Sequence, residues 1–80
     1  MKATIYGRPG CTFCVQAKAL AANHGIEVDY KLVGEDILKE KLEEMIGHEI
    51  RSVPQIFISS DGFSEYVGGY QEFKKRLEGN

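Results

Sequence analysis

The segment that decides the fold reads Ala3-Thr4-Ile5-Tyr6-Gly7-Arg8-Pro9-Gly10-Cys11-Thr12-Phe13-Cys14. Residues 3–6 form a short β-branched run and predict a strand, which the glycines and the proline after it end. An alanine-rich stretch with apolar residues at helical spacing follows from Thr12 to His24, and Gly25 is placed to end that helix in the left-handed conformation. Two cysteines separated by two residues therefore lie where a strand becomes a helix.

A second strand and a second helix are expected in the middle of the chain. Residues 26–32 alternate apolar and charged side chains, which is the period of a half-buried strand. Residues 35–46 predict a helix, with Glu35 and Asp36 suited to its positive N-terminal end and Gly47 suited to its C-terminal end. Its apolar stripe consists of Ile37, Leu38, Leu42, Met45 and Ile46.

The last third of the chain predicts a hairpin and a final helix. Residues 55–59 follow Pro54 as a strand, and Asp61-Gly62 is a two-residue turn that leads into a further strand over residues 63–67. A helix is expected from about Tyr70 to Leu77. The predicted order is therefore β-α-β-α-β-β-α, with the first two strands parallel and the hairpin antiparallel.

Length and composition limit the class of protein. At 80 residues, folding hides only about 60–65% of the unfolded chain's surface, so residues 1–80 are expected to form a single domain with one small core. The net charge is −2 and the basic residues are scattered, which argues against nucleic acid and against a membrane surface as partners. The chain enters a strand at once and leaves no room for a signal peptide, so we expect a cytoplasmic protein. There, paired cysteines are more often catalytic or metal-binding than structural.

The position of the two cysteines predicts different roles for them. Cys11 is expected at or just before the first helical turn, where free N–H groups and the helix dipole favour a thiolate. Cys14 lies about one turn further on and should be more buried, with a normal or raised pKa. We therefore expect Cys11 to attack a disulfide and Cys14 to resolve the mixed disulfide that results. Arg8, three residues before Cys11, is placed to add positive charge near its sulfur.

Taken alone, a C-x-x-C pair is also half of a zinc site, which usually needs four ligands. His24 and His48 are the other candidates, but each lies at a predicted helix end, where a histidine interacts well with the last carbonyl groups. They form no pair at ligand spacing. We therefore prefer redox chemistry and expect no metal.

Three separated motifs resemble the dithiol glutaredoxins, and the resemblance covers nearly the whole chain. They are Gly7-Arg8-Pro9-Gly10-Cys11-Thr12-Phe13-Cys14-Val15-Gln16-Ala17-Lys18, Arg51-Ser52-Val53-Pro54-Gln55-Ile56-Phe57 and Val67-Gly68-Gly69-Tyr70-Gln71-Glu72-Phe73. The second is similar to the family's T-V-P-x-x-F loop and the third to its G-G-x-x-D segment. The resemblance implies an α/β, thioredoxin-like fold with a four-stranded mixed sheet and three helices. It also implies a cis peptide bond before Pro54.

The resemblance further implies that glutathione is the reducing co-substrate, with no cofactor bound. The family's basic groups for the glycyl carboxylate map to Arg8 and Arg51, with Lys41 as a third candidate. The Val53 backbone would pair with the cysteinyl part, the start of the last helix would hold the γ-glutamyl carboxylate, and Glu72 would take the amine. The expected glutathione-binding residues are Arg8, Thr12, Phe13, Arg51, Ser52, Val53, Pro54, Gly69, Tyr70, Gln71 and Glu72.

Some residues depart from the family's pattern. Thr12 replaces the usual proline between the cysteines, which makes the helix start less rigid. Phe13 replaces a usual tyrosine and so lacks a phenol that could line the cleft. Gln71 and Glu72 stand where shorter Thr or Asp-type residues are common.

Two alternative functions remain on this reading. One is a redoxin reduced by thioredoxin reductase, against which Arg51 and residues 68–72 argue. The other is an iron–sulfur carrier in which Cys11 and glutathione hold a cluster between two protomers, although most such relatives have a single active-site cysteine. The expected partners of a monomer are glutathione and disulfide-containing or glutathionylated proteins. Ribonucleotide reductase is the target expected for short glutaredoxins of bacteria and their phages, although no residue here encodes it.

Overall fold

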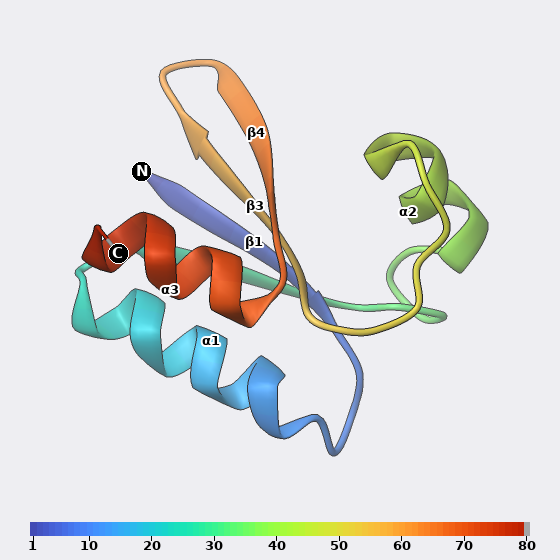
Figure 1. The fold of residues 1–80 in the computed structure, drawn as a ribbon. Coiled ribbons are helices and arrows are strands. Elements are labelled where there is room, and N and C mark those ends of the chain that lie inside the picture. The colour runs from blue at the N-terminus through green and yellow to red at the C-terminus, as the bar shows by residue number, and fades with distance from the viewer. Residues whose placement is uncertain (80) are drawn as a thin grey trace.

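The structure, a computed structural model, describes residues 1–79 and contains a sheet flanked by helices (Figure 1). Its elements are β1 (Lys2–Gly7), α1 (Thr12–Asn23), β2 (Glu27–Leu32), α2 (Lys39–Ile46), β3 (Gln55–Ser60), β4 (Phe63–Gly68) and α3 (Tyr70–Glu78). Within these residues the chain therefore has the predicted order of four strands and three helices. No helix in this range is both long and apolar enough to cross a membrane.

The strands lie in the order β2-β1-β3-β4, which makes β1 and β3 central. The parallel pairing of β1 with β2 is confirmed and places Ile5 opposite Tyr30. On its other side Ile5 lies opposite Ile56 in the antiparallel pair of β1 and β3. The antiparallel hairpin of β3 and β4 is also confirmed. The sheet is thus mixed, as the resemblance implied.

One face of the sheet carries the larger part of the core, and α1 and α3 lie side by side on it (Figure 1). Ala17 and Ala21 are fully buried, because small side chains allow α1 to approach the strands closely. Phe73 of α3 is also fully buried, and burial of a side chain of this size stabilises the fold by about 1.5–3 kcal/mol. The buried residues of this face are Ala3, Ile5, Ala17, Ala21, Ile26, Ile56, Ile58 and Phe73.

The opposite face is covered by α2, which stands apart from the other helices (Figure 1). A smaller buried cluster lies here, formed by Tyr6, Leu42, Ile50 and Phe57. The predicted apolar stripe of α2 is only partly correct. Leu42 is fully buried, whereas Leu38 is 65% exposed and Met45 is 47% exposed. The short helix α2 therefore packs against the sheet mainly through Leu42.

The predicted start of α2 was wrong by four residues. Glu35 and Asp36 lie in a turn after β2, where the backbone N–H groups of both donate to the Leu32 carbonyl. The Asp36 carboxylate in turn accepts the Leu32 N–H at 2.8 Å. This local hydrogen bonding competes with helix formation, as short acidic side chains often do. The helix therefore begins at Lys39, and these two acids do not lie on its N-terminal end.

The predicted turns and helix ends are confirmed. Asp61 and Gly62 have φ angles of 49° and 85°, as a two-residue hairpin turn with both central residues left-handed requires. Gly47 ends α2 at φ 94° and donates its N–H to the Glu43 carbonyl. Gly25, at φ 69°, follows the end of α1. The sequence therefore predicts correctly where α1 and α2 end and where the hairpin turns.

Candidate active site

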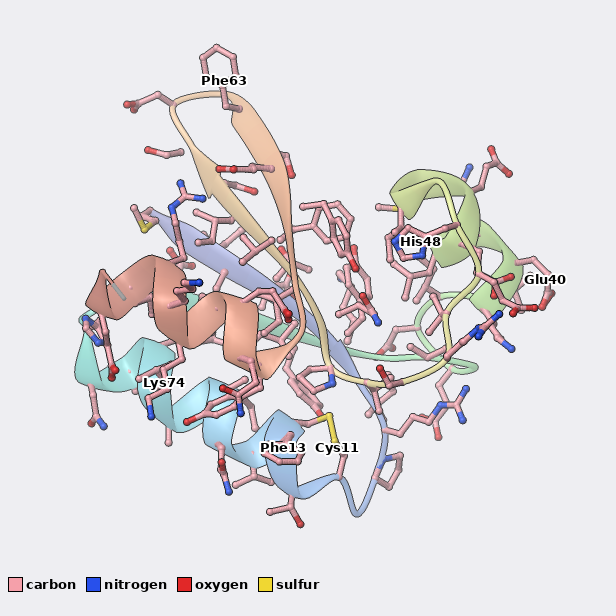
Figure 2. The ribbon with its side chains drawn as sticks, in the orientation of Figure 1. Cys11, Phe13, Glu40, His48, Phe63 and Lys74 are labelled. Atoms are coloured by element: carbon pink, nitrogen blue, oxygen red, sulfur yellow. A yellow bond between two sulfur atoms is a disulfide. The ribbon has the colours of Figure 1, made fainter. Side chains whose placement is uncertain are left out.

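The two cysteines lie at the N-terminal end of α1 and form a disulfide (Figure 2). Cys11 is the N-cap residue, with extended backbone angles, and Cys14 lies in the first turn. Their Cα atoms are 5.2 Å apart, within the usual range for a disulfide. The predicted position of the pair, one helical turn apart at the start of the helix, thus brings the two sulfurs within disulfide distance.

The sulfur of Cys11 faces hydrogen-bond donors. The backbone N–H of Cys14 donates to Cys11 Sγ at 3.1 Å, so the sulfur caps the helix in place of a hydroxyl or carboxylate. The first turn of α1, which lies wholly among the described residues, contains no acidic side chain. After reduction, the N–H donor and the positive end of the helix dipole therefore both favour a thiolate at this position.

Cys14 lies deeper than Cys11, as predicted. It is fully buried, whereas Cys11 is partly exposed, so a bulky disulfide can reach only Cys11. The Cys14 sulfur lies over Gly7, beside the hydroxyl of Tyr30. Burial raises the pKa of Tyr30, and the Lys18 ammonium lies 4.3 Å from the centre of its ring. Lys18, one turn beyond Cys14, thus contacts an aromatic ring.

The loop before β3 approaches the cysteines from the other side. The bond between Val53 and Pro54 is cis, as the resemblance implied. The Val53 carbonyl oxygen lies 3.8 Å from Cys11 Sγ. The backbone of this loop is therefore the part of the chain that a molecule bonded to Cys11 would meet first.

Two cavities meet at Ser52 and Val53, which line both of them. The first has a volume of about 310 Å³ and is lined by Phe13, Ser52, Val53, Pro54, Gly69, Tyr70, Gln71 and Glu72. The second has a volume of about 300 Å³ and is lined by Arg8, Lys39, Ile50, Arg51, Ser52 and Val53. We name them the helix cavity and the basic cavity. Together they form a groove on either side of the Val53 backbone.

Two aromatic rings border the helix cavity. Phe13 is 50% exposed and lies next to Cys11 at the start of α1 (Figure 2). Its ring centre is 5.6 Å from that of Tyr70. Because this exposed ring lies beside the reactive sulfur, it gives an apolar wall against which the stem of a bound thiol can pack.

The floor of the helix cavity is the N-terminal end of α3. The Glu72 carboxylate accepts the N–H of Gly69, the N-cap residue, at 2.9 Å. This contact is one half of a capping box and satisfies one of the free N–H donors at the helix start. The remaining N–H groups of the first turn form a site suited to an anion.

Most residues predicted for the site line these two cavities, but two of them line neither. Among the described residues of the predicted set, Thr12 lines neither cavity. Lys41 forms an exposed ion pair with Glu44 at 3.8 Å, and Lys39 lines the basic cavity instead. The resemblance pointed to Lys41, and no sequence signal marked Lys39, because its place beside the cavity depends on how α2 packs against the loop before β3.

The histidines do not complete a metal site. Within residues 1–79, no three His, Cys, Asp or Glu side chains gather where they could hold a metal ion. His24 is the C-cap residue of α1, as its position at a helix end predicted. The ring of His48 packs edge-on against Tyr66, with their centres 5.9 Å apart.

Several known proteins are similar to this chain in sequence and in fold. The sequence model of the glutaredoxin family matches residues 3–63. Glutaredoxin 1 of Escherichia coli is 36% identical over 100% of this chain and 96% of its own length. A glutaredoxin of Haemophilus influenzae is 41% identical over 98% of this chain and 92% of its own. The solved structure of reduced E. coli glutaredoxin superimposes with a TM-score of 0.81 at 34% identity, covering 100% of this chain and 96% of that one. The chain therefore belongs to the glutaredoxin family of thiol–disulfide oxidoreductases.

Proposed function

We propose that the protein uses glutathione to reduce protein disulfides and glutathione mixed disulfides through Cys11 and Cys14. The observation that carries this proposal is the position of Cys11. Its sulfur lies beside the Val53 carbonyl, between a cavity with three basic side chains and a cavity that ends at a helix N-terminus. A thiol peptide with a carboxylate at each end matches that arrangement.

Glutathione has this chemistry, because it carries two carboxylates and one amine around a central thiol. Arg8, Lys39 and Arg51 supply positive charge for the glycyl carboxylate in the basic cavity. Free N–H groups at the start of α3 suit the γ-glutamyl carboxylate in the helix cavity. The Glu72 carboxylate in the same cavity suits the amine, although it already accepts the Gly69 N–H. The Val53 backbone between them can pair with the cysteinyl residue.

The reaction is a series of thiol–disulfide exchanges. The Cys11 thiolate attacks one sulfur of a substrate disulfide, forms a mixed disulfide and releases the other sulfur as a thiolate, which takes up a proton. With a protein substrate, Cys14 loses its proton and attacks Cys11, which frees the reduced protein and leaves the Cys11–Cys14 disulfide. One glutathione thiolate then opens that bond at Cys11, and a second removes the first as glutathione disulfide. With a glutathione mixed disulfide, Cys11 alone suffices.

This chemistry indicates the compartment and the protein partners of the proposed reaction. A reducing compartment such as the cytoplasm would supply glutathione and keep the cysteine pair available as a dithiol. The protein partners would be disulfide-containing or glutathionylated proteins that a monomer can approach with its exposed Cys11 face. Ribonucleotide reductase belongs to this chemical class of partner, since its turnover consumes a dithiol.

The test is the source of electrons. The purified protein is given a disulfide substrate and NADPH, with either glutathione plus glutathione reductase or thioredoxin reductase alone. We expect turnover with the first mixture and none above background with the second. Turnover with thioredoxin reductase alone would contradict the proposal, and would identify a redoxin of the alternative type. Turnover in neither mixture would also contradict it.

A further inference from the structure

Gln55 is a buried polar side chain directly beside the active-site loop. It is 6% exposed, and it begins β3 immediately after Pro54. Both ends of its amide are used. The Nε2 atom donates to the Ser52 carbonyl at 2.8 Å, and Oε1 accepts a hydrogen bond from the Tyr66 hydroxyl. A side chain from the β3 strand thus connects the hairpin to the loop that separates the two cavities.

The chemistry of the partners allows only this orientation of the amide. A backbone carbonyl can only accept a hydrogen bond, so the NH₂ group must face Ser52. The amide oxygen then faces Tyr66, whose hydroxyl must donate. Burial, and then the charge of Glu72, raises the pKa of Tyr66, so its hydroxyl remains a donor in neutral solution. The Ser52 carbonyl therefore decides which end of Gln55 reaches the loop, and the Tyr66 hydroxyl bonds the other end.

Tyr66 is itself held in place by neighbouring rings. Its ring centre lies 5.3 Å from that of Phe57 and 5.9 Å from that of His48. Phe57 belongs to the buried cluster under α2. The hydroxyl thus has a defined position, set by packing on the sheet face opposite α1 and α3.

The group that Gln55 holds is the backbone of the active-site loop. Ser52 and Val53 line both cavities, and the Val53 carbonyl lies 3.8 Å from Cys11 Sγ. Upstream, the loop is tied by the Ile50 N–H, which donates to the Glu43 carboxylate at 2.8 Å. Loss of the Gln55 contact would leave the Ser52 carbonyl without this donor and free the peptide unit between Ser52 and Val53 to rotate.

We infer that Gln55 and Tyr66 are positioning residues that hold the Ser52–Val53 backbone against Cys11 and so set the affinity for the peptide part of the substrate. This inference rests on the proposed function, because that peptide is taken to be glutathione. Neither residue touches the reacting sulfurs. Their effect should therefore fall on KM for the glutathione-bearing substrate and leave kcat at saturation nearly unchanged.

The test compares two tyrosines of the cluster under α2, of which Tyr6 is buried and Tyr66 is partly buried. Tyr66→Phe removes the hydroxyl that donates to the Gln55 amide oxygen and so holds that side chain in place. Tyr6→Phe is the matched control, because Tyr6 also contacts the Phe57 ring, edge-on, with ring centres 5.7 Å apart. Within residues 1–79, its hydroxyl makes no hydrogen bond. Gln55→Met, which keeps the length of the side chain but has no donor, removes the contact with Ser52 itself.

Each variant is assayed with a glutathionylated peptide as substrate, and its thermal unfolding is measured. For Tyr66→Phe we expect KM to rise roughly fivefold, and for Gln55→Met roughly tenfold, with kcat within about twofold of wild type. Tyr6→Phe should leave KM unchanged. An unchanged KM in Tyr66→Phe would overturn the inference, as would an equal rise in KM in Tyr6→Phe.

A second measurement separates this inference from the proposed function. The backbone amide signal of Val53 is recorded by NMR in the wild type and in the two tyrosine variants. If the wild type shows no turnover with glutathione, the proposed function fails, and this signal alone decides the positioning role. A displaced Val53 signal in Tyr66→Phe but not in Tyr6→Phe supports it, and an unmoved signal in both overturns it.

Discussion

The backbone N–H of Cys14 donates to the sulfur of Cys11 at 3.1 Å, so the Cys11 side chain caps the helix whose first turn contains Cys14. Both partners of this contact come from the same helical turn, and no distant part of the chain is required to form it. The contact makes the two cysteines chemically different even though they share one disulfide. One sulfur is partly exposed and faces a donor, and the other is fully buried.

This difference predicts the behaviour of two serine variants. Cys14→Ser should keep the reduction of glutathione mixed disulfides and lose the reduction of protein disulfides, because Cys11 remains while the resolving thiol is gone. Cys11→Ser should lose both activities, since serine is not a nucleophile toward disulfides at neutral pH. The two substrates are assayed in parallel on each variant. Activity that survives in Cys11→Ser would show that the roles are assigned wrongly.

Gly7→Ala should destabilise the protein. A Cβ atom at this position would clash with the Tyr30 hydroxyl oxygen and lie 2.8 Å from Cys14 Sγ. Forcing extra volume into a packed site costs about 1–3 kcal/mol, so the free energy of unfolding should fall by that amount. Chemical denaturation of the variant and the wild type measures the difference.

Gly69→Ala is the matched control for this stability measurement. A Cβ atom there would have the flexible Glu72 carboxylate as its nearest neighbour, at 3.3 Å. Both substitutions restrict the unfolded chain to a similar extent, so their difference reports the contacts at Gly7. Equal losses of stability in the two variants would mean that the space around Gly7 is not restricted.

We expect Lys39→Gln and Lys41→Gln to differ in their effect on KM for glutathione. Lys39 lines that cavity, and Lys41 pairs with Glu44 on the exposed side of the helix. Because exposed charge pairs contribute little, loss of Lys39 should raise KM for glutathione only roughly two- to fivefold. Lys41→Gln should leave it unchanged. The rise for Lys39→Gln should shrink at high salt, since salt screens exposed charges. A larger effect from Lys41→Gln would contradict the geometry.

The tyrosines predict a loss of stability at alkaline pH. Burial raises the pKa of Tyr6, Tyr30 and Tyr66 above their ordinary value of 10.0. The folded chain then holds these protons more tightly than the unfolded chain does. The contribution of these tyrosines to the free energy of unfolding should therefore be fully present below about pH 10 and be lost as pH rises through the raised pKa values.

Denaturation curves across this range measure the fall, and tyrosinate absorbance follows the titration itself. Tyr66→Phe removes one of the three groups, so its stability should decline less steeply with pH than that of the wild type. Identical slopes in the two proteins would mean that burial does not perturb Tyr66. The comparison also cancels the contribution of the lysines, which lose protons in the same range.

Much of the fold could be predicted from the sequence because its signals are local. The hairpin turn depends on Asp61 and Gly62, whose backbone angles the sequence itself favours. The end of α2 at Gly47 is equally local. The start of α2 was mispredicted because Asp36 has two local options, a helix start or a turn that bonds Leu32, and the sequence pattern does not rank them.

The position of the cysteine pair at the start of α1 and the deeper burial of Cys14 could be predicted from the sequence alone, since spacing and helix position decide both. The tertiary structure decided which other groups surround Cys11. It brought the Val53 carbonyl to 3.8 Å from Cys11 Sγ, chose Lys39 over Lys41 for the basic cavity, and connected Tyr66 to the loop through Gln55. These contacts join residues far apart in the chain. Their distances depend on how strands and helices pack, which no local pattern of side chains specifies.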